Sequence, residues 1–164
     1  NAHEVTVTLI DITDPAQPAV RETITFEGAL ASSRLIETRL HLVISASPVL
    51  PADPTPQTLA AMPLEAWIPD YQLRGADNSA VSSGDVVGWQ SFDRPENPDG
   101  YGVTTALSID IENPTPPFAA TAISADAGLV YASTEALYIA DTNYDYERFT
   151  FREDTAVHKL TFTS

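Results

Sequence analysis

The pattern Ile-Asp-Ile-x-x-Pro occurs twice in this chain, at Ile10–Pro15 and at Ile109–Pro114. Each copy ends a run of alternating β-branched, apolar and polar residues, Val5–Ile12 in the first case and Val103–Ile111 in the second. Such alternation is typical of a strand with one buried face. The proline that follows cannot donate to a continuing strand ladder. The repeated pattern therefore predicts two copies of one β unit.

Further strands follow in the same order in both copies. The alternating run Val20–Phe26 has its counterpart in Phe118–Ile123. A strand–turn–strand unit comes next in each copy, at residues 33–45 and at Leu129–Ala140, where polar residues separate two apolar runs. Four strands joined by short links within about 45 residues are typical of one propeller blade.

Residues 47–101 separate the two copies and differ from them in composition, because they are rich in proline. Thr58–Trp67 is expected to form one or two short helical turns, with Asp53 or Thr55 as the N-cap. A loop of this length is usually functional or an insertion with its own structure. We interpret residues 47–101 as a partly helical insertion.

Four shorter segments have conformations predicted from local patterns. Gly75–Gly84 is polar and is expected to form turns, whereas Val86–Trp89 is expected to form a short strand. Tyr144–Phe151 alternates aromatic and charged residues, which predicts an outer strand. Val157–Phe162 is predicted to be one more strand, at the position where a third blade would begin.

The predicted fold is all-β, with about two to three antiparallel, four-stranded propeller-like blades and a partly helical insertion at residues 47–101. Residues 3–164 are expected to form a single, partial propeller-type domain, and Asn1-Ala2 is interpreted as the remnant of an expression tag. A closed propeller typically takes about four to eight blades. Three arrangements therefore stay open: part of a longer chain, a ring completed by several chains, or an open sandwich-like body.

The charge of the chain excludes one class of partner. There are 23 acidic and 8 basic residues, which gives a net charge of −15. A surface of that sign repels phosphate backbones, so nucleic acid is not expected as a partner. No apolar run approaches the ~18 residues of a membrane-spanning helix, and no membrane span is expected. The chain has no cysteine, which rules out disulfides and thiolate metal sites.

Six stretches of the chain resemble a known family. They are VTLIDITDPAQP, SSRLIETRLHLVIS, PLEAWIPDY, TTALSIDI, LVYASTEALYIA and TAVHKL. In these stretches, and in their order, the chain is similar to secreted bacterial and archaeal proteins with a C-terminal β-propeller domain, distantly related to WD-repeat propellers. The resemblance covers most of residues 4–162. It implies a secreted or cell-envelope location and no established activity, and it offers no catalytic residues to carry over.

A loop in the insertion offers a candidate metal site. Asp93, Asn97 and Asp99 supply oxygen ligands ahead of Gly100, and hard oxygen ligands are what Ca²⁺ prefers. The spacing does not match an EF-hand loop, so a solvated turn is the alternative. Calcium is the one cofactor that the sequence suggests.

Five aromatic residues fall in or beside the insertion: Trp67, Tyr71, Trp89, Phe92 and Tyr101. Four of them, Trp67, Tyr71, Trp89 and Tyr101, are the candidate ligand or partner surface. Stacked on one face, they would hold a sugar or a peptide. The alternative is that they cover a small core of the insertion itself. His41 is interpreted as a strand residue whose ring is hydrogen-bonded, and the chain has no GxSxG nucleophile motif.

Two functions are compatible with these features. The first is a non-catalytic interaction or structural module of an exported protein, with a protein or glycan as partner. The alternative is a hydrolase acting on a glycan or an ester where the blades converge. An enzyme would show a pocket with convergent polar groups and perturbed carboxylates, whereas a module would show an exposed aromatic patch. Unpaired edges at Val5–Ile12 and Val157–Phe162 would also favour homo-oligomers.

Overall fold

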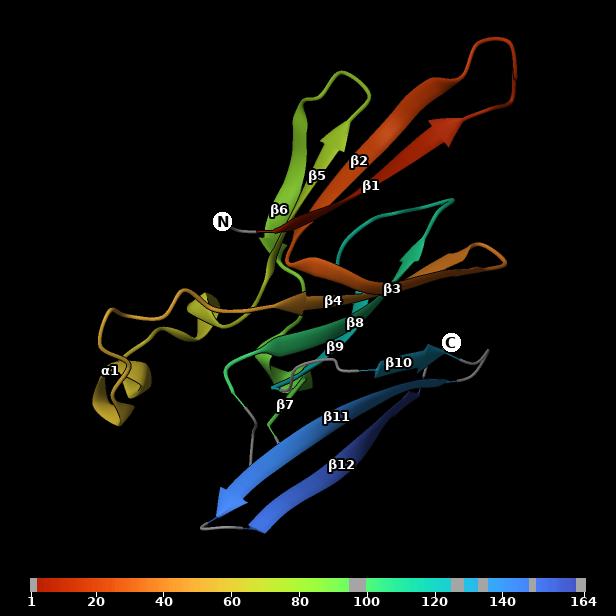
Figure 1. The fold of residues 1–164 in the computed structure, drawn as a ribbon. Coiled ribbons are helices and arrows are strands. Elements are labelled where there is room, and N and C mark those ends of the chain that lie inside the picture. The colour runs from red at the N-terminus through yellow and green to blue at the C-terminus, as the bar shows by residue number, and fades with distance from the viewer. Residues whose placement is uncertain (1–2, 95–99, 125–128, 133–135, 148–149, 162–164) are drawn as a thin grey trace.

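The computed structural model describes residues 3–94, 100–124, 129–132, 136–147 and 150–161 (Figure 1). Its strands form three sheets, here called A, B and C, which follow one another in that order from top to bottom of Figure 1. The strand pairs in these residues are antiparallel, apart from the short parallel pair of β7 (Phe92–Asp93) and β9 (Ala119–Ile123). The predicted all-β, antiparallel fold is confirmed.

Sheet A has the strand order β1-β2-β5-β6. These strands are β1 (Glu4–Asp11), β2 (Ala19–Glu27), β5 (Asp70–Gly75) and β6 (Ala80–Asp85). Val5 pairs with Phe26 and Val7 pairs with Ile24, so the strand alternation places these apolar side chains on one face. Sheet A therefore has one face suited to a core.

Sheet B has the strand order β3-β4-β8-β9-β7. Its remaining strands are β3 (Ala29–Ile36), β4 (Arg39–Ala46) and β8 (Val103–Asp110). The inner strand β8 is buried over most of its length, and the middle of β4, His41–Ile44, is buried as well. Because β4 ends before residue 47 and β8 begins after residue 101, this antiparallel unit is assembled across the insertion.

Sheet C consists of β10 (Leu129–Ala132), β11 (Ala136–Glu147) and β12 (Thr150–Thr161). The predicted hairpin at Leu129–Ala140 is confirmed, with Leu129 opposite Ala140, while turn residues 133–135 lie outside the described part. The prediction of one outer strand at Tyr144–Phe151 is wrong. That run contains the end of β11 and the start of β12, and the aromatic–charged alternation simply continues from one strand into the next.

The chain passes from sheet A to sheet B at Gly28, between β2 and β3. Gly28 has φ +115°, and a Cβ there would lie 2.6 Å from Cγ2 of Ile44 and 2.8 Å from the carbonyl oxygen of Ser45. Its N–H donates to the carbonyl oxygen of His3 at 2.7 Å. Both the backbone conformation and the close approach of β4 therefore require glycine at this position.

The sequence predicted that the first four strands form one blade, but the structure divides them between two sheets. Strands β1 and β2 share sheet A with β5 and β6 from the insertion, because β2 pairs with β5. The strands β3 and β4 belong to sheet B, where β4 pairs with β8. The prediction of turns throughout Gly75–Gly84 is also wrong, because β6 begins at Ala80. Ser82, Ser83 and Gly84 have low intrinsic strand preference, but pairing with β5 and packing outweigh it.

The two copies of the repeat nevertheless share the pairing of consecutive strands. The hairpin β1–β2 corresponds to β8–β9, and β3–β4 corresponds to β10–β11. In each copy the first hairpin belongs to one sheet and the second hairpin to the next. The copies differ in that β1 lies at the edge of sheet A, whereas β8 lies inside sheet B between β4 and β9.

The main core lies between sheets A and B. Phe118, just before β9, contacts Phe26 and Tyr71 edge-on, with ring centroids 5.6 Å and 5.1 Å apart. Ile44 and Ile109 of sheet B are fully buried in the same cluster. Edge-on aromatic pairs add about 0.5–1.5 kcal/mol to the stabilisation from area burial. This core holds sheet A on sheet B.

The rest of the insertion forms short helical turns: α1 (Pro56–Ala60), η1 (Leu64–Ala66) and η2 (Trp89–Ser91). The helical turns predicted within Thr58–Trp67 are confirmed. The strand predicted at Val86–Trp89 is wrong, because Trp89 begins η2 and the two valines are buried in separate clusters. No helix in the described residues is long and apolar enough to cross a membrane.

Candidate functional site

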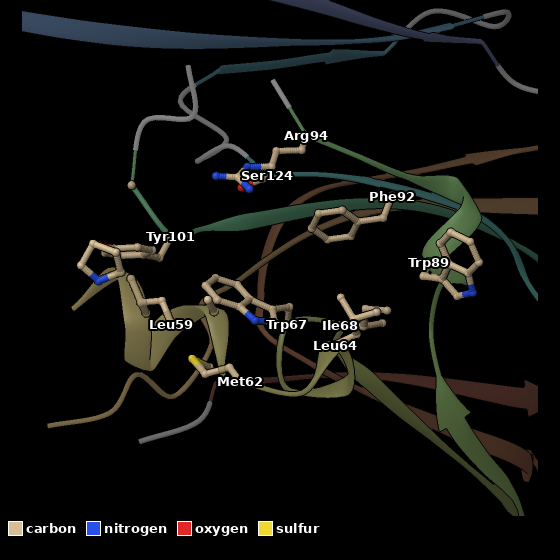
Figure 2. A pocket seen from close by; sticks show the side chains of 13 residues that line it. Leu59, Met62, Leu64, Trp67, Ile68, Trp89, Phe92, Arg94, Tyr101 and Ser124 are labelled. Carbon is tan, nitrogen blue, oxygen red and sulfur yellow. The ribbon is translucent and has the colours of Figure 1, made fainter. Parts of the chain in front are cut away.

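The insertion and one end of sheet B line a cleft of about 680 Å³ (Figure 2). The residues around it are Pro56, Leu59, Ala60, Met62, Leu64, Trp67, Ile68, Trp89, Phe92, Arg94, Gly100, Tyr101 and Ser124. Most of these side chains are apolar or aromatic. Small-molecule and cofactor sites typically occupy about 300–1,000 Å³, so the cleft is large enough to hold a ligand or part of a partner.

A capping box starts the wall formed by α1. The N–H of Thr58 donates to Oγ1 of Thr55 at 3.2 Å, and the N–H of Thr55 donates to Oγ1 of Thr58 at 2.9 Å. Of the two N-cap residues predicted from the sequence, Asp53 and Thr55, the structure uses Thr55. Pro56 occupies the first helical position, where its missing N–H costs no hydrogen bond. This short turn carries Leu59 into the cleft.

A small buried cluster ties the cleft to sheet B. Ile68 and Val87 from the insertion pack with Val103 of β8 and Ala122 of β9, and Phe92 packs against this cluster. The parallel pair β7–β9 places Phe92 opposite Ala122. The lining residues Ile68 and Phe92 are therefore supported by strands of sheet B as well as by loops.

Three aromatic side chains remain accessible around the cleft. The rings of Trp67 and Tyr101 lie with centroids 6.4 Å apart at an interplanar angle of 48°. Trp67 lies in the middle of the view in Figure 2, with Tyr101 to its left and Trp89 to its right. Trp89 is 66% exposed and Tyr101 is 42% exposed. A group of exposed aromatic side chains of this kind is typical of a ligand or partner site.

Arg94 and Ser124 supply the polar edge of the cleft. Asp93 of β7 accepts a hydrogen bond through its carbonyl oxygen from the N–H of Ser124 at 2.9 Å, which continues the β7–β9 pairing to these two residues. Figure 2 shows both side chains together along one side, opposite Met62. Among the described residues that line the cleft, Arg94 is the only charged one.

The structure brings together three of the four aromatic residues predicted as a ligand surface. Trp67, Trp89 and Tyr101 line the cleft, but Tyr71 does not. Tyr71 is buried between sheets A and B, and its hydroxyl shares a hydrogen bond of 3.0 Å with Oγ of Ser82. Its assignment to the ligand surface was wrong, because its strand turns it into the core.

Sequence reasoning missed Leu59, Met62 and Arg94 as residues of the cleft, whereas Phe92, one of the five aromatic residues noted, does line it. Leu59 and Met62 are three positions apart in the stretch predicted to form helical turns, a spacing that puts two side chains on one face of a helix. That signal was available from the sequence. No comparable signal marks Arg94, because its position depends on the two-residue strand pair that precedes it.

The calcium prediction stays a prediction. Asp93 lies in β7, whereas Asn97 and Asp99 lie outside the described residues. Within the part of the chain that the structure describes, no group of three or more histidine, aspartate or glutamate side chains could hold a metal ion.

The described titratable groups with shifted pKa values lie away from the cleft, and two of them, His41 and Asp70, belong to the sheets. Burial, and then the charge of Arg39, lowers the pKa of His41, and its Nδ1 shares a 2.7 Å hydrogen bond with Oγ of Ser108. The hydrogen-bonded strand histidine predicted from the sequence is thereby confirmed. Partial burial, followed by the charges of Glu27 and Asp85, raises the pKa of Asp70 in sheet A.

A family model described as a beta propeller domain matches residues 1–164. The chain belongs to this family. No curated protein and no solved structure matches it. The three antiparallel sheets agree with a propeller domain, and the cleft lies at the insertion that interrupts one of its sheets. The match covers the insertion that lines the cleft as well as the strands of the three sheets.

Proposed function

We propose that this propeller domain is a non-catalytic interaction module, and that its insertion cleft binds an apolar segment of a partner protein. The observation that carries the proposal is the open cleft lined by Trp67, Trp89 and Tyr101. Tryptophan and tyrosine are enriched among the residues that dominate binding energy at protein interfaces, where neighbouring contacts exclude water. An aromatic cleft of this kind gains stability when a partner covers it.

The remaining lining favours a peptide over a glycan. Leu59, Met62 and Leu64 offer apolar contacts, and methionine adapts well to apolar side chains of varied shape. A sugar needs several polar groups placed around its hydroxyls. The described lining offers only Arg94 and Ser124, together with the polar tips of the aromatic residues.

The same lining favours binding over hydrolysis. A hydrolase needs a positioned acid or base close to the substrate. Among the described lining residues there is no carboxylate and no histidine. Asp70, the carboxyl whose pKa is raised, lies on sheet A, and His41 is engaged with Ser108 on sheet B. These observations favour the interaction module over the hydrolase alternative.

The chain offers a direct test, because its two tryptophans both line the cleft. Intrinsic tryptophan fluorescence therefore reports on the cleft. We expect a titration with the peptide acetyl-GSLFL-amide to change the emission saturably, and acetyl-GSSSS-amide to leave it unchanged. Trp89→Ala should weaken binding about tenfold, because truncating an interface tryptophan commonly costs more than 1 kcal/mol.

The matched control is Leu35→Ala, which removes another exposed apolar side chain, on β3 and outside the cleft. This variant should bind the apolar peptide like the wild type. If the apolar peptide leaves the emission unchanged, or if Leu35→Ala weakens binding as much as Trp89→Ala, the cleft is not the binding site.

Export and self-association belong to the same proposal. A secreted or cell-envelope location rests on the sequence resemblance, and fractionation of the native host with an antibody against this chain tests it. Self-association is supported by β1 and β12, each an outermost strand of its sheet in the described residues. Light scattering should show a mass that rises with concentration, whereas a constant monomer mass would contradict it.

A further inference from the structure

We infer that the cleft recognises the C-terminal end of a partner protein: an apolar last residue whose free carboxylate is received by Arg94 and Ser124. This inference rests on the proposed function, since it specifies which kind of apolar segment enters the cleft. The lining of the cleft is asymmetric. Arg94 and Ser124 lie on one side, and apolar side chains such as Met62 lie on the other.

The backbone just before Arg94 is fixed at the cleft by its pairing with β9. The hydrogen bond from the N–H of Ser124 to the carbonyl oxygen of Asp93 fixes the chain next to Arg94 against β9. Phe92, two residues earlier, packs into the small cluster below the cleft. The guanidinium that this backbone carries can donate two parallel hydrogen bonds to a carboxylate, which gives both attraction and orientation.

The charge of the whole chain makes a positively charged cleft edge informative. With a net charge of −15, most of the surface repels anions. The described lining of the cleft nevertheless contains an arginine and no acidic residue. A positive group placed in an apolar site on an acidic protein selects a ligand with an anionic group at that point.

The same charge favours a chain end over an acidic internal segment. A partner segment with several acidic residues would meet repulsion from the surrounding surface, which acts over about 8–10 Å at physiological salt. A C-terminal residue brings one carboxylate and one apolar side chain together on the same Cα. It can therefore place the carboxylate at Arg94 and its side chain among Trp67, Phe92 and Met62 with the smallest added negative charge.

The test compares three peptides on the full chain by tryptophan fluorescence: acetyl-GSLFL with a free carboxylate, the same peptide as the amide, and acetyl-GDLFL-amide. We expect the free acid to bind about five- to tenfold more tightly than its amide, the scale of one charge-assisted hydrogen-bonded contact. The peptide with the internal aspartate should bind no better than the plain amide.

Variants at Arg94 assign the preference to this side chain. Arg94→Gln should bind acid and amide equally, and Arg94→Lys should retain part of the preference because the charge stays. Arg74→Gln, which removes a cation from sheet A, should retain all of it.

The outcomes separate this inference from the proposed function. Equal binding of acid and amide, with both still weakened by Trp89→Ala, would overturn the carboxylate contact and leave the apolar cleft intact. Binding of the internal-aspartate peptide as tightly as the free acid would overturn the choice of a chain end. If none of the three peptides binds, the proposed function and this inference both fail.

Discussion

The core between sheets A and B and the cleft in the insertion are both aromatic, but only the core is closed. In the core, Phe118 contacts Phe26 and Tyr71 edge-on within 5.6 Å, and Phe26 is fully buried. Around the cleft, the rings of Trp67 and Tyr101 are 6.4 Å apart, and Trp89 beside them is two-thirds exposed. Similar aromatic side chains are thus buried against one another in the core and left exposed around the cleft.

The difference comes from the backbone that carries the aromatic residues. Phe26 and Tyr71 lie opposite each other on paired strands, so the alternation of the sheet points both into the same layer. Trp67 and Trp89 lie at the ends of short helical turns, where no partner strand sets their direction. Strand residues thus contribute to folding stability, while the turn residues retain apolar surface that a partner can cover.

The largest effect on this comparison is expected from Phe26→Ala. Removing a fully buried phenylalanine leaves a cavity and removes the edge-on contact with Phe118, so the free energy of unfolding should fall by about 3–5 kcal/mol. Trp89→Ala removes a larger side chain but should change stability by no more than about 0.5 kcal/mol, because the residue is mostly exposed. Urea unfolding followed by circular dichroism measures both.

Equal losses of stability in the two variants would break the comparison. Such a result would mean that Trp89 is packed as part of the fold and that the cleft is not open in solution. In that case the fluorescence titrations would also need another explanation.

A smaller loss is expected from Gly28→Ala, at the crossing between sheets A and B. The positive φ and the contacts at 2.6 Å and 2.8 Å to β4 leave no room for a Cβ, so we expect a loss of about 1–3 kcal/mol. Gly88, the residue before η2, is the control, because its φ is −70° and a Cβ there would meet no atom within 4 Å. Thermal unfolding of Gly28→Ala and Gly88→Ala should therefore separate clearly.

A neutral Gly28→Ala, or a Gly88→Ala as damaging as it, would contradict this account of the crossing. It would show that β2 and β3 can follow each other without the close approach of Ile44. The closed core would then depend less on the position of the crossing than the structure indicates.

Local pattern was sufficient to predict the strands and hairpins of the repeat, but not the sheets they join. The alternation in Val5–Ile12 and Val103–Ile111 identified β1 and β8. Nothing local indicates that β2 pairs with β5 across more than forty residues, since pairing of distant strands leaves no trace in the spacing of either one. The serine- and glycine-rich β6 was missed for the same reason.

The candidate site was predictable in part, and Tyr71 shows what the sequence could still have revealed. Composition indicated that aromatic residues of the insertion gather, and three of them do. Tyr71 and Leu73 alternate with the polar residues Gln72 and Arg74, which is the pattern of a half-buried strand. That alternation separates Tyr71 from Trp67 and Trp89. The position of Arg94 depends on tertiary pairing and carries no such signal.

The smallest effect is expected on the solvent side of the strand that buries Tyr71. Asp70 lies opposite Asp85 on β6 and near Glu27, and partial burial together with these charges raises its pKa. The folded state thus holds this proton more tightly than the unfolded chain does. The contribution of Asp70 to stability is present below its unfolded pKa of about 3.9 and is lost as the pH rises through the raised folded pKa.

Asp70→Asn should therefore stabilise the protein at pH 7 and lose this advantage as the pH falls toward 3. Like charges opposite each other cost about 0.2–1 kcal/mol, and solvent screening at this exposed position keeps the gain at the lower end. Asp77→Asn should act in the opposite direction, because hydrogen bonds from Ser79 lower the pKa of Asp77. The urea midpoints of both variants are measured at pH 7 and pH 3. If the two variants shift the midpoint in the same direction, this account of the Asp70 and Asp77 pKa values is wrong.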